Sequence, residues 1–202
     1  MEIFTNETAS KLYNHIYDWL ASYTPDSHAR ISKFQYYQKN IWNILYKKYY
    51  EIINKKELSF IEKDFIESVF YKGKIYRVQK YNFRNKGHVY EMSNLCASWS
   101  KKLKGVSNLT NFNGSILLLV AKATLAVDTI GLLEFLFSYY KIDFEDFKHP
   151  QRLQKYFEEY EVINPINFKE IKGIFIVDKS KVTRYKKYSI TLAKEKWKRK
   201  KL

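Results

Sequence analysis

The period of the hydrophobic pattern changes at about residue 71, and this change restricts the folds that are open to the chain. Before it, apolar residues recur every three or four positions, as Leu12, Ile16 and Leu20 do, which is typical of an amphipathic helix. After it, residues 74–79 alternate apolar and polar side chains, as a half-buried strand does. Helices followed mostly by strands predict an α+β fold with an antiparallel or mixed sheet.

Three helices are expected in the first 70 residues. The first ends before the helix-breaking residues Thr24-Pro25-Asp26. A longer helix follows, and its apolar stripe consists of Ile31, Phe34, Ile41, Leu45, Tyr49 and Ile52. Ser59 and Glu62 have the spacing of a capping box, which predicts that a third helix begins there and extends to about Val69.

The rest of the chain is expected to be mainly sheet. A short apolar run at 95–99 and a nearly continuous one at 115–121 predict strands, and the second of these is expected to be buried on both faces. Asp128 is placed to cap a helix. Three further strands are expected at 160–163, 168–177 and 185–192.

Length and composition favour one integrated domain. The chain has 202 residues, and 46% of them are hydrophobic, which is enough to bury a substantial core. We expect a helical segment at 1–70 packed on a core at 71–202 that ends in a basic tail. With six glycines and three prolines, long disordered linkers are not expected.

The chain carries a strong positive charge. It has 36 Lys and Arg residues against 21 Asp and Glu residues, which gives a formal net charge of +15. Such a field attracts polyanions, among them nucleic acid, a ribonucleoprotein, an acidic protein surface and an anionic membrane. A lysine-rich composition also keeps a surface soluble without any such partner, so the charge alone leaves the partner open.

Several features predict a cytoplasmic protein. Cys96 is the single cysteine, which excludes an intramolecular disulfide and fits a reducing compartment. Its apolar neighbours favour a place in the core over a reactive thiol. The first ten residues lack the basic and apolar regions of a signal peptide, and the longest apolar run, at 116–120, is too short to span a membrane.

Two short motifs in the expected strands carry groups that bind ligands. Arg77 has a guanidinium that can bind phosphate oxygens bidentately, although a structural salt bridge is the common role of such an arginine. In Ser98-Trp99-Ser100, the two hydroxyls at i and i+2 point to one face of a strand, where they can bind a ligand or orient a carboxylate. An ordinary strand end has the same appearance.

A third motif, Glu159-Tyr160-Glu161, adds two carboxylates that are expected to share one face of a strand. A fixed carboxylate stabilises the positive charge that develops on a sugar carbon when its glycosidic bond breaks. A second carboxylate can orient or deprotonate an incoming nucleophile. The pair is therefore suited to breaking the bond between a ribose and its leaving group.

Together the three motifs resemble the Arg / Ser-x-Ser / Glu-x-Glu signature of the mono-ADP-ribosyltransferases. The resemblance covers about residues 70–192 and implies a split β-sandwich that binds NAD as co-substrate and releases nicotinamide. It implies that Arg77, Ser98 and Ser100 bind NAD, and that Ser98 also organises the catalytic Glu161. By the same resemblance Glu159 engages the acceptor, which we expect to be an arginine side chain.

Length, the helical N-terminal segment and the basic charge are most similar to the small phage-type members of this family. They imply a macromolecular target in the host cytoplasm, such as RNA polymerase or a ribosomal or other nucleic-acid-associated protein. The basic faces are also compatible with direct contact with nucleic acid. An aromatic side chain from Tyr156 or Phe157 is expected to touch the target.

Two other functions remain open. The positive charge and the many tyrosines also fit a basic, non-enzymatic protein that binds nucleic acid or a ribonucleoprotein. Such a protein would inhibit its partner by occupancy. An enzyme that only hydrolyses NAD has the same three motifs. No metal site is expected, because the histidines lack the spacing of metal ligands; they are His15, His28, His88 and His149.

Overall fold

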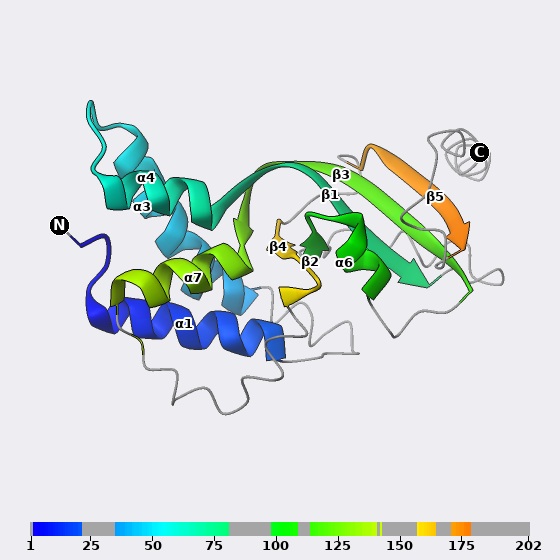
Figure 1. Ribbon diagram of the computed structural model, residues 1–202, viewed down its shortest axis with the longest axis horizontal. Helices are drawn as coiled ribbons and strands as arrows, with labels where there is room; N and C mark the ends of the chain where they lie inside the picture. The colour runs from blue at the N-terminus through cyan, green and yellow to red at the C-terminus, as the bar shows by residue number, and fades with distance from the viewer. Residues whose placement is uncertain are drawn as a thin grey trace. The chain divides into compact units, whose positions relative to one another are not determined.

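The computed structural model describes residues 2–21, 35–80, 98–108, 114–140, 142, 157–164 and 171–178. It combines helices at the N-terminal end with an antiparallel sheet, which confirms the α+β class (Figure 1). The chain divides into two compact units. The helical unit contains Met1–Tyr71 and Leu125–Phe157, and the sheet unit contains Lys72–Thr124 and Glu158–Leu202. The sequence analysis predicted a single boundary, at residue 70, between the helical segment and the core.

The described helices of the helical unit bury the faces that the sequence predicts. These helices are α1 (Asn6–Ala21), the π-helix η1 (Gln38–Trp42), α3 (Asn43–Ile53), α4 (Phe60–Val69) and α7 (Thr129–Tyr140). On α1, the residues Leu12, Ile16 and Leu20 are buried, whereas Trp19, which was predicted on the same face, is half-buried. Along η1 and α3, the buried residues of the predicted stripe are Ile41, Leu45, Tyr49 and Ile52. The helical period therefore identified the inner faces correctly.

The capping box predicted at the start of α4 is present. Ser59 donates hydrogen bonds from its backbone N–H and its hydroxyl to Oε2 of Glu62, at 2.9 and 2.8 Å. Lys55 forms an ion pair with Oε1 of the same carboxylate. The hydrogen bond from Lys55, followed by those from Ser59, lowers the pKa of Glu62 from an ordinary value of 4.5 to about 2.

We expect Glu62 to make stability depend on pH in the acid range. Its pKa is lower in the folded than in the unfolded chain, so its ion pair and cap stabilise the fold above pH 4.5 and are lost as the pH falls towards 2. Glu62→Gln should lower the free energy of unfolding at neutral pH and should flatten its decline between pH 4.5 and 2. Urea titrations at several pH values measure both effects.

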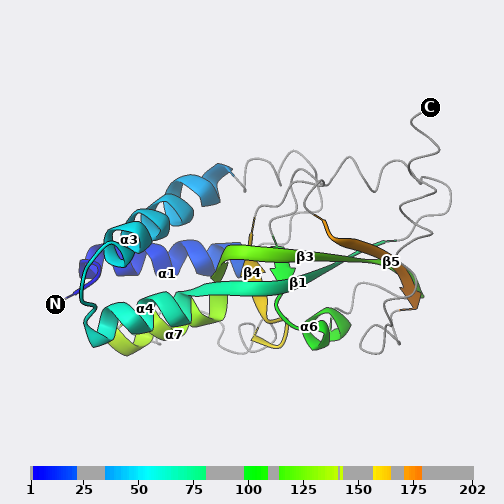
Figure 2. The same cartoon turned by 90° about the horizontal axis from the view of Figure 1, so that it is seen from above.

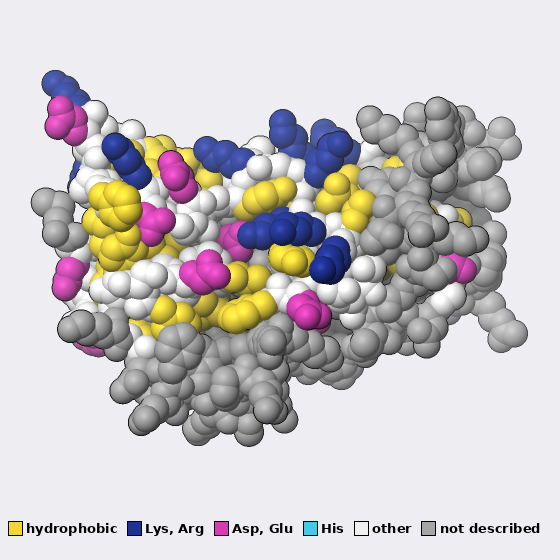
Figure 3. All heavy atoms as spheres, viewed as in Figure 1, with side chains coloured by type: hydrophobic (Ala, Val, Ile, Leu, Met, Phe, Trp, Pro, Cys, Tyr) yellow, Lys and Arg dark blue, Asp and Glu magenta, His cyan; other side chains and the backbone are white. Residues whose placement is uncertain are grey.

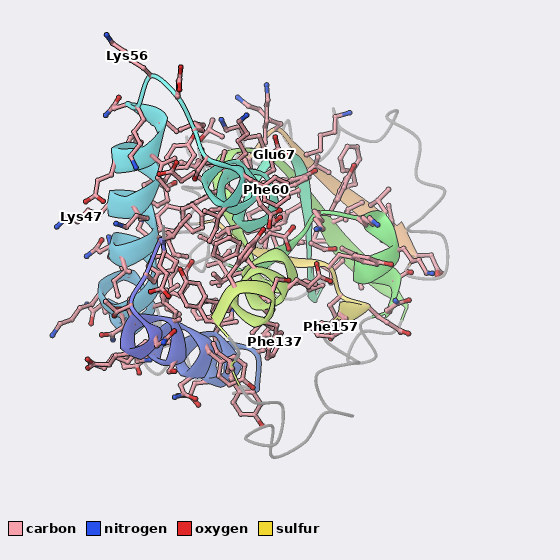
Figure 4. The ribbon with its side chains drawn as sticks, turned by 60° about the vertical axis from the view of Figure 1, so that its left-hand side comes forward. Lys47, Lys56, Phe60, Glu67, Phe137 and Phe157 are labelled. Carbon is pink, nitrogen blue, oxygen red and sulfur yellow. The ribbon has the colours of Figure 1, made fainter. Side chains whose placement is uncertain are left out.

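The matched control for this experiment is Glu67→Gln, an exposed position on the same helix (Figure 4). It should retain the pH dependence of the wild type. If Glu62→Gln also retained that dependence, the role assigned to the Glu62 carboxylate would be wrong.

A cluster of aromatic rings fills the core of the helical unit. The ring centroid of Phe65 on α4 lies 5.5 Å from those of Phe4 and Phe70, and 5.3 Å from that of Phe135 on α7. The Tyr140 hydroxyl accepts a hydrogen bond of 2.7 Å from the backbone N–H of Phe4. These contacts join the start of the chain to both α4 and α7, which lie far apart in the sequence.

Helix α7 begins as the sequence predicts and then passes very close to α4. Oδ1 of Asp128 accepts a hydrogen bond of 3.2 Å from the backbone N–H of Gly131, which confirms the predicted cap. A Cβ atom added at Gly131 would lie 1.8 Å from the backbone oxygen of Ser68 on α4. The approach of the two helices therefore depends on glycine at this position.

The sheet unit is built on five antiparallel strands. They are β1 (Phe70–Lys80), β2 (Ser98–Ser100), β3 (Ser115–Asp128), β4 (Glu161–Ile163) and β5 (Gly173–Asp178). The order across the sheet is β1-β2-β4-β3-β5, and the pairs β1–β2, β2–β4 and β3–β5 are antiparallel. β1 also pairs with β3, so the two long strands run side by side (Figures 1 and 2).

One face of this sheet is covered by α6 (Leu103–Asn108), a short helix that the sequence analysis did not predict. The buried apolar cluster on this face consists of Val78, Val106, Ile116, Leu118, Val120 and Phe175. Val106 comes from α6 and the others from β1, β3 and β5. The side chains from 116 to 121 are all buried, as predicted for a strand covered on both faces.

Some expectations fall on residues that the structure does not describe. They include Ile31 and Phe34, Cys96, the strand at 185–192, the basic C-terminal tail and positions 168–170 of the strand expected at 168–177. The described strand in that region is β5, Gly173–Asp178. Within the described ranges, no helix has the length and apolar character needed to cross a membrane.

Candidate active site

Two hydroxyls and a carboxylate lie on one face of the β2–β4 ladder. In this antiparallel pair, Ser98 lies opposite Ile163, and Ser100 lies opposite Glu161. Residues that face each other across a ladder point to the same side, and so do residues two positions apart on one strand. Ser98, Ser100 and Glu161 therefore share a face, as the sequence predicts for the two serines.

The central contact of this face joins Ser98 to Glu161. The Ser98 hydroxyl donates a hydrogen bond of 2.5 Å to Oε1 of Glu161, which lies diagonally across the ladder. Glu161 is only 9% exposed, and a carboxylate buried to this extent needs donors to remain charged. Ser98 supplies one of them.

Arg77 reaches the same serine through the backbone. Its Nη1 atom donates a hydrogen bond of 2.5 Å to the carbonyl oxygen of Ser98. In the β1–β2 pair, Tyr76 lies opposite Ser100, so the side chain of Arg77 leaves the sheet on the face opposite to the Ser98 hydroxyl. The structure therefore brings the guanidinium to the backbone of Ser98 from the other side of the sheet.

Within the described parts of the chain, the Nε atom of Arg77 is left without a partner by this contact. This atom is buried and has no hydrogen-bond partner among the described residues. Buried N–H groups are normally paired, because leaving a donor unsatisfied costs free energy. Because this atom has almost no exposed surface, an anion could reach it only after a local rearrangement.

Glu159 does not share a strand with Glu161, contrary to the prediction. β4 begins at Glu161, and the residues before it, 158–160, form a turn. Tyr160 has a φ angle of +50°, in the left-handed region, which interrupts the alternation of side chains that a strand imposes. The position of Glu159 is consequently determined by the turn.

This turn is held by residues 100–108, which we call the clamp segment. Three successive carbonyl oxygens of the turn accept hydrogen bonds from it. The donors are the Asn108 side chain, the Ser100 hydroxyl and the Lys101 backbone N–H, which bind in that order the carbonyls of Glu158, Glu159 and Tyr160 at 3.1, 2.7 and 3.0 Å. Every carbonyl of the turn thus lies within hydrogen-bonding distance of a donor in the clamp segment.

The hydroxyl of Ser100 is engaged with backbone groups. It accepts a hydrogen bond of 3.2 Å from the N–H of Lys102, and it lies 2.7 Å from the carbonyl oxygens of both Lys102 and Glu159. The hydroxyl has one proton, so it donates a hydrogen bond to one of these two carbonyls at a time. Ser100 is also buried, so the structure places it between the clamp segment and the turn, whereas the resemblance gave it a role in binding NAD.

Charged and aromatic side chains flank the turn. Lys102 and Lys104 are exposed, and Nζ of Lys102 lies 4.2 Å from the ring centroid of Tyr160, a cation–π contact. Phe157, directly before the turn, is 37% exposed (Figure 4), and Tyr156 lies outside the described residues. Figure 3 shows exposed Lys and Arg side chains beside hydrophobic ones on one face.

This arrangement can stabilise a cation and bind an anion. The Glu161 carboxylate is fixed by Ser98 and largely removed from water, so it interacts strongly with positive charge that develops near it. The Arg77 guanidinium is suited to a phosphate group. The parts of the chain that the structure describes hold no group of three or more His, Cys, Asp and Glu side chains placed to bind a metal ion.

Sequence reasoning missed two residues that hold the turn beside the site, Gly105 and Asn108. Asn108 acts on the carbonyl of Glu158, which lies 50 residues further along the chain. Gly105 has no side chain, so the backbone of Glu159 can pack directly against α6 at this position. No signal in the sequence marks either contact, because each involves a backbone carbonyl, which every residue has.

Comparison with known proteins found no relative of this chain: no family model matches it, and no curated protein or solved structure does. The site is therefore interpreted from its own residues.

Proposed function

We propose that the protein is a mono-ADP-ribosyltransferase, which moves ADP-ribose from NAD to a macromolecular target. The observation that carries this proposal is the hydrogen bond from Ser98 to the buried Glu161. Ser98 is bound in turn by Arg77, and these partners lie 63 and 21 residues away from it in the sequence. Three unrelated matches to a signature have no reason to meet in this way, so the contacts support the resemblance.

The split β-sandwich of this family is the fold that we infer for the sheet unit. Its support is that the three motifs occupy or adjoin three neighbouring strands, β1, β2 and β4. The order in which these strands lie brings the motifs together although the chain between them is long.

In the proposed reaction, Glu161 stabilises the positive charge that develops at ribose C1′ as the bond from this carbon to the nicotinamide nitrogen breaks. The electron pair of that bond leaves with nicotinamide. A nitrogen of the acceptor arginine then forms a bond to C1′ and gives up one proton, which balances the reaction. Ser98 keeps Glu161 oriented through the hydrogen bond that its hydroxyl donates to Oε1.

Arg77 is the residue that we propose to hold the diphosphate of NAD. The support for this role is that a guanidinium binds phosphate oxygens bidentately and that Arg77 contacts the backbone of Ser98. Ser98 joins the two parts of the proposed site, because its carbonyl binds Arg77 and its hydroxyl binds Glu161.

Glu159→Gln is expected to impair transfer to arginine far more than nicotinamide release. Glu159 lies in the turn before β4, where a carboxylate can accept a proton from the incoming guanidinium, whereas the bond between Ser98 and Glu161 is left intact. Loss of such a base lowers transfer by about a hundredfold or more. Parallel assays of nicotinamide release and label transfer measure the two reactions.

Glu158→Gln is the control for this variant, since it removes the same charge from an exposed neighbour in the same turn. It should leave both reactions close to the wild-type rates. Equal losses of transfer and nicotinamide release in Glu159→Gln would contradict the role of Glu159 at the acceptor.

The direct test of the proposed function is incubation of the protein with labelled NAD and a cell lysate. Label that becomes attached to a discrete protein band would support transfer and would identify the target. Label that appears only as free ADP-ribose would indicate an NAD hydrolase. If no nicotinamide is released in the presence of the lysate, the proposal fails.

Binding to nucleic acid without catalysis is a second candidate function, favoured by exposed lysines on both units. Lys47 and Lys56 point away from the helical unit (Figure 4). Among the described residues of the sheet unit, the exposed lysines are Lys72, Lys74, Lys102, Lys104, Lys122 and Lys172. This function would be supported by binding to RNA or DNA that weakens steeply with salt and does not require NAD.

A further inference from the structure

The turn before β4 is a constrained structure, and the clamp segment constrains it. Tyr160 adopts φ +50°, a conformation that is unfavourable for residues other than glycine. Such a conformation persists only when its surroundings enforce it. Here the surroundings are the donors to the three carbonyls of the turn and the contact of Lys102 with the Tyr160 ring.

Helix α6 fits against this turn because residue 105 has no side chain. A Cβ atom added at Gly105 would lie 2.1 Å from the carbonyl oxygen of Glu159 and 2.5 Å from Oγ of Ser100. Both distances are far shorter than van der Waals contact. Any other residue at this position would push the turn away from α6, and the backbone of Glu159 would move first because it is the nearest group.

The two carboxylates of the site belong to segments that are held in different ways, although Ser100 contacts both segments. Glu161 lies in β4, where it pairs with Ser100 in the ladder and accepts the hydroxyl of Ser98. The backbone of Glu159 lies in the turn, where the clamp segment binds it. A change in α6 that leaves the ladder intact should therefore displace Glu159 more than Glu161.

We propose that Gly105 and Asn108 are positioning residues that aim Glu159 at the acceptor and so determine whether ADP-ribose passes to the target or to water. This inference rests on the proposed function. In the hydrolytic branch the same bond to nicotinamide breaks, and a water oxygen bonds to ribose C1′ and gives up one proton. Glu161 serves both branches, whereas Glu159 serves transfer. Displacing Glu159 shifts the partition towards hydrolysis.

The test uses Gly105→Ala and Asn108→Ala in the full chain, with labelled NAD and a lysate that contains the target. The quantity measured is the ratio of protein-bound label to free ADP-ribose, together with the rate of nicotinamide release and the KM for NAD. We expect the ratio to fall by about tenfold or more in Gly105→Ala, because small displacements of a reacting group are costly. In Asn108→Ala it should fall by about fivefold, the effect of one hydrogen bond.

The matched control is Ser107→Ala, because the Ser107 hydroxyl binds the carbonyl of Lys104 within α6 and not the turn. Nicotinamide release and the KM for NAD should stay within about twofold of the wild type in Asn108→Ala and in this control, since neither residue touches Ser98 or Glu161. If Gly105→Ala fails to fold, Asn108→Ala still decides the matter.

An unchanged ratio in Asn108→Ala, or a parallel loss of transfer and hydrolysis, would overturn the positioning role while leaving the transferase intact. A wild-type protein that releases no nicotinamide in the same assay would instead overturn the proposed function, and the positioning role with it. The two failures are distinguished by the wild-type sample alone.

Discussion

Glu161→Gln should eliminate nearly all nicotinamide release and ADP-ribose transfer. Glutamine keeps the shape of the side chain and an oxygen that can accept the bond from Ser98, so the fold should be retained. What is lost is the negative charge that stabilises the developing positive charge on the ribose. Removing one preorganised electrostatic group of this kind lowers kcat by about a hundredfold to a thousandfold. Release of labelled nicotinamide under saturating NAD measures the loss.

The control is Glu158→Gln, which neutralises an exposed carboxylate three positions away and should leave the rate nearly unchanged. Thermal unfolding of both variants should be close to that of the wild type, which separates a chemical from a folding defect. A Glu161→Gln protein as active as the wild type would refute the transferase. Binding to nucleic acid with steep salt dependence would then become the leading function.

Gly131→Ala should destabilise the protein by about 3 kcal/mol or more, as overpacking at a tight contact does. Helix propensity alone predicts the opposite, since alanine is better than glycine inside a helix by about 1 kcal/mol. The contact decides the sign, because the new methyl group would lie 1.8 Å from the backbone oxygen of Ser68, and backbone cannot rotate away. The two helices would have to separate and expose the aromatic core around Phe65 and Phe135.

Thermal and urea unfolding measure this effect, and the melting temperature should fall by roughly 6–12 °C for a chain of this size. Ser138→Ala is the matched control, since it introduces the same residue on an exposed position of the same helix. Its stability should stay within about 0.5 kcal/mol of the wild type. A Gly131→Ala protein more stable than the wild type would show that α4 and α7 are not in this contact.

The helical part of the fold was predictable because its signals are local. The spacing of Leu45, Tyr49 and Ile52 identifies a buried helix face within two turns. Ser59 and Glu62 specify the start of α4 across three residues. Helix α6 was not predictable in the same way, because six residues are too few to show a period.

The candidate site was predictable only in part. The sequence identified Arg77, Ser98 and Glu161 as groups suited to one reaction, and the structure joins them through Ser98. It did not reveal that Arg77 approaches from the opposite face, which depends on the pairing of Tyr76 with Ser100. The expectation that Glu159 shares a strand with Glu161 was wrong, because the alternation rule does not hold across a left-handed residue such as Tyr160.

The sequence by itself determined the α+β class, the inner faces of the helices and the starts of α4 and α7. Periodicity and helix caps act over a few neighbouring residues, so they can be read along the chain. Only the tertiary structure decided the hydrogen bond from Ser98 to Glu161, the clamp on the turn and the close approach of α4 and α7. The bond between the two side chains depends on the pairing of β2 with β4, which brings their motifs together. The clamp and the close approach involve backbone oxygens and the absence of a side chain at Gly105 and Gly131, and these leave no pattern in the sequence.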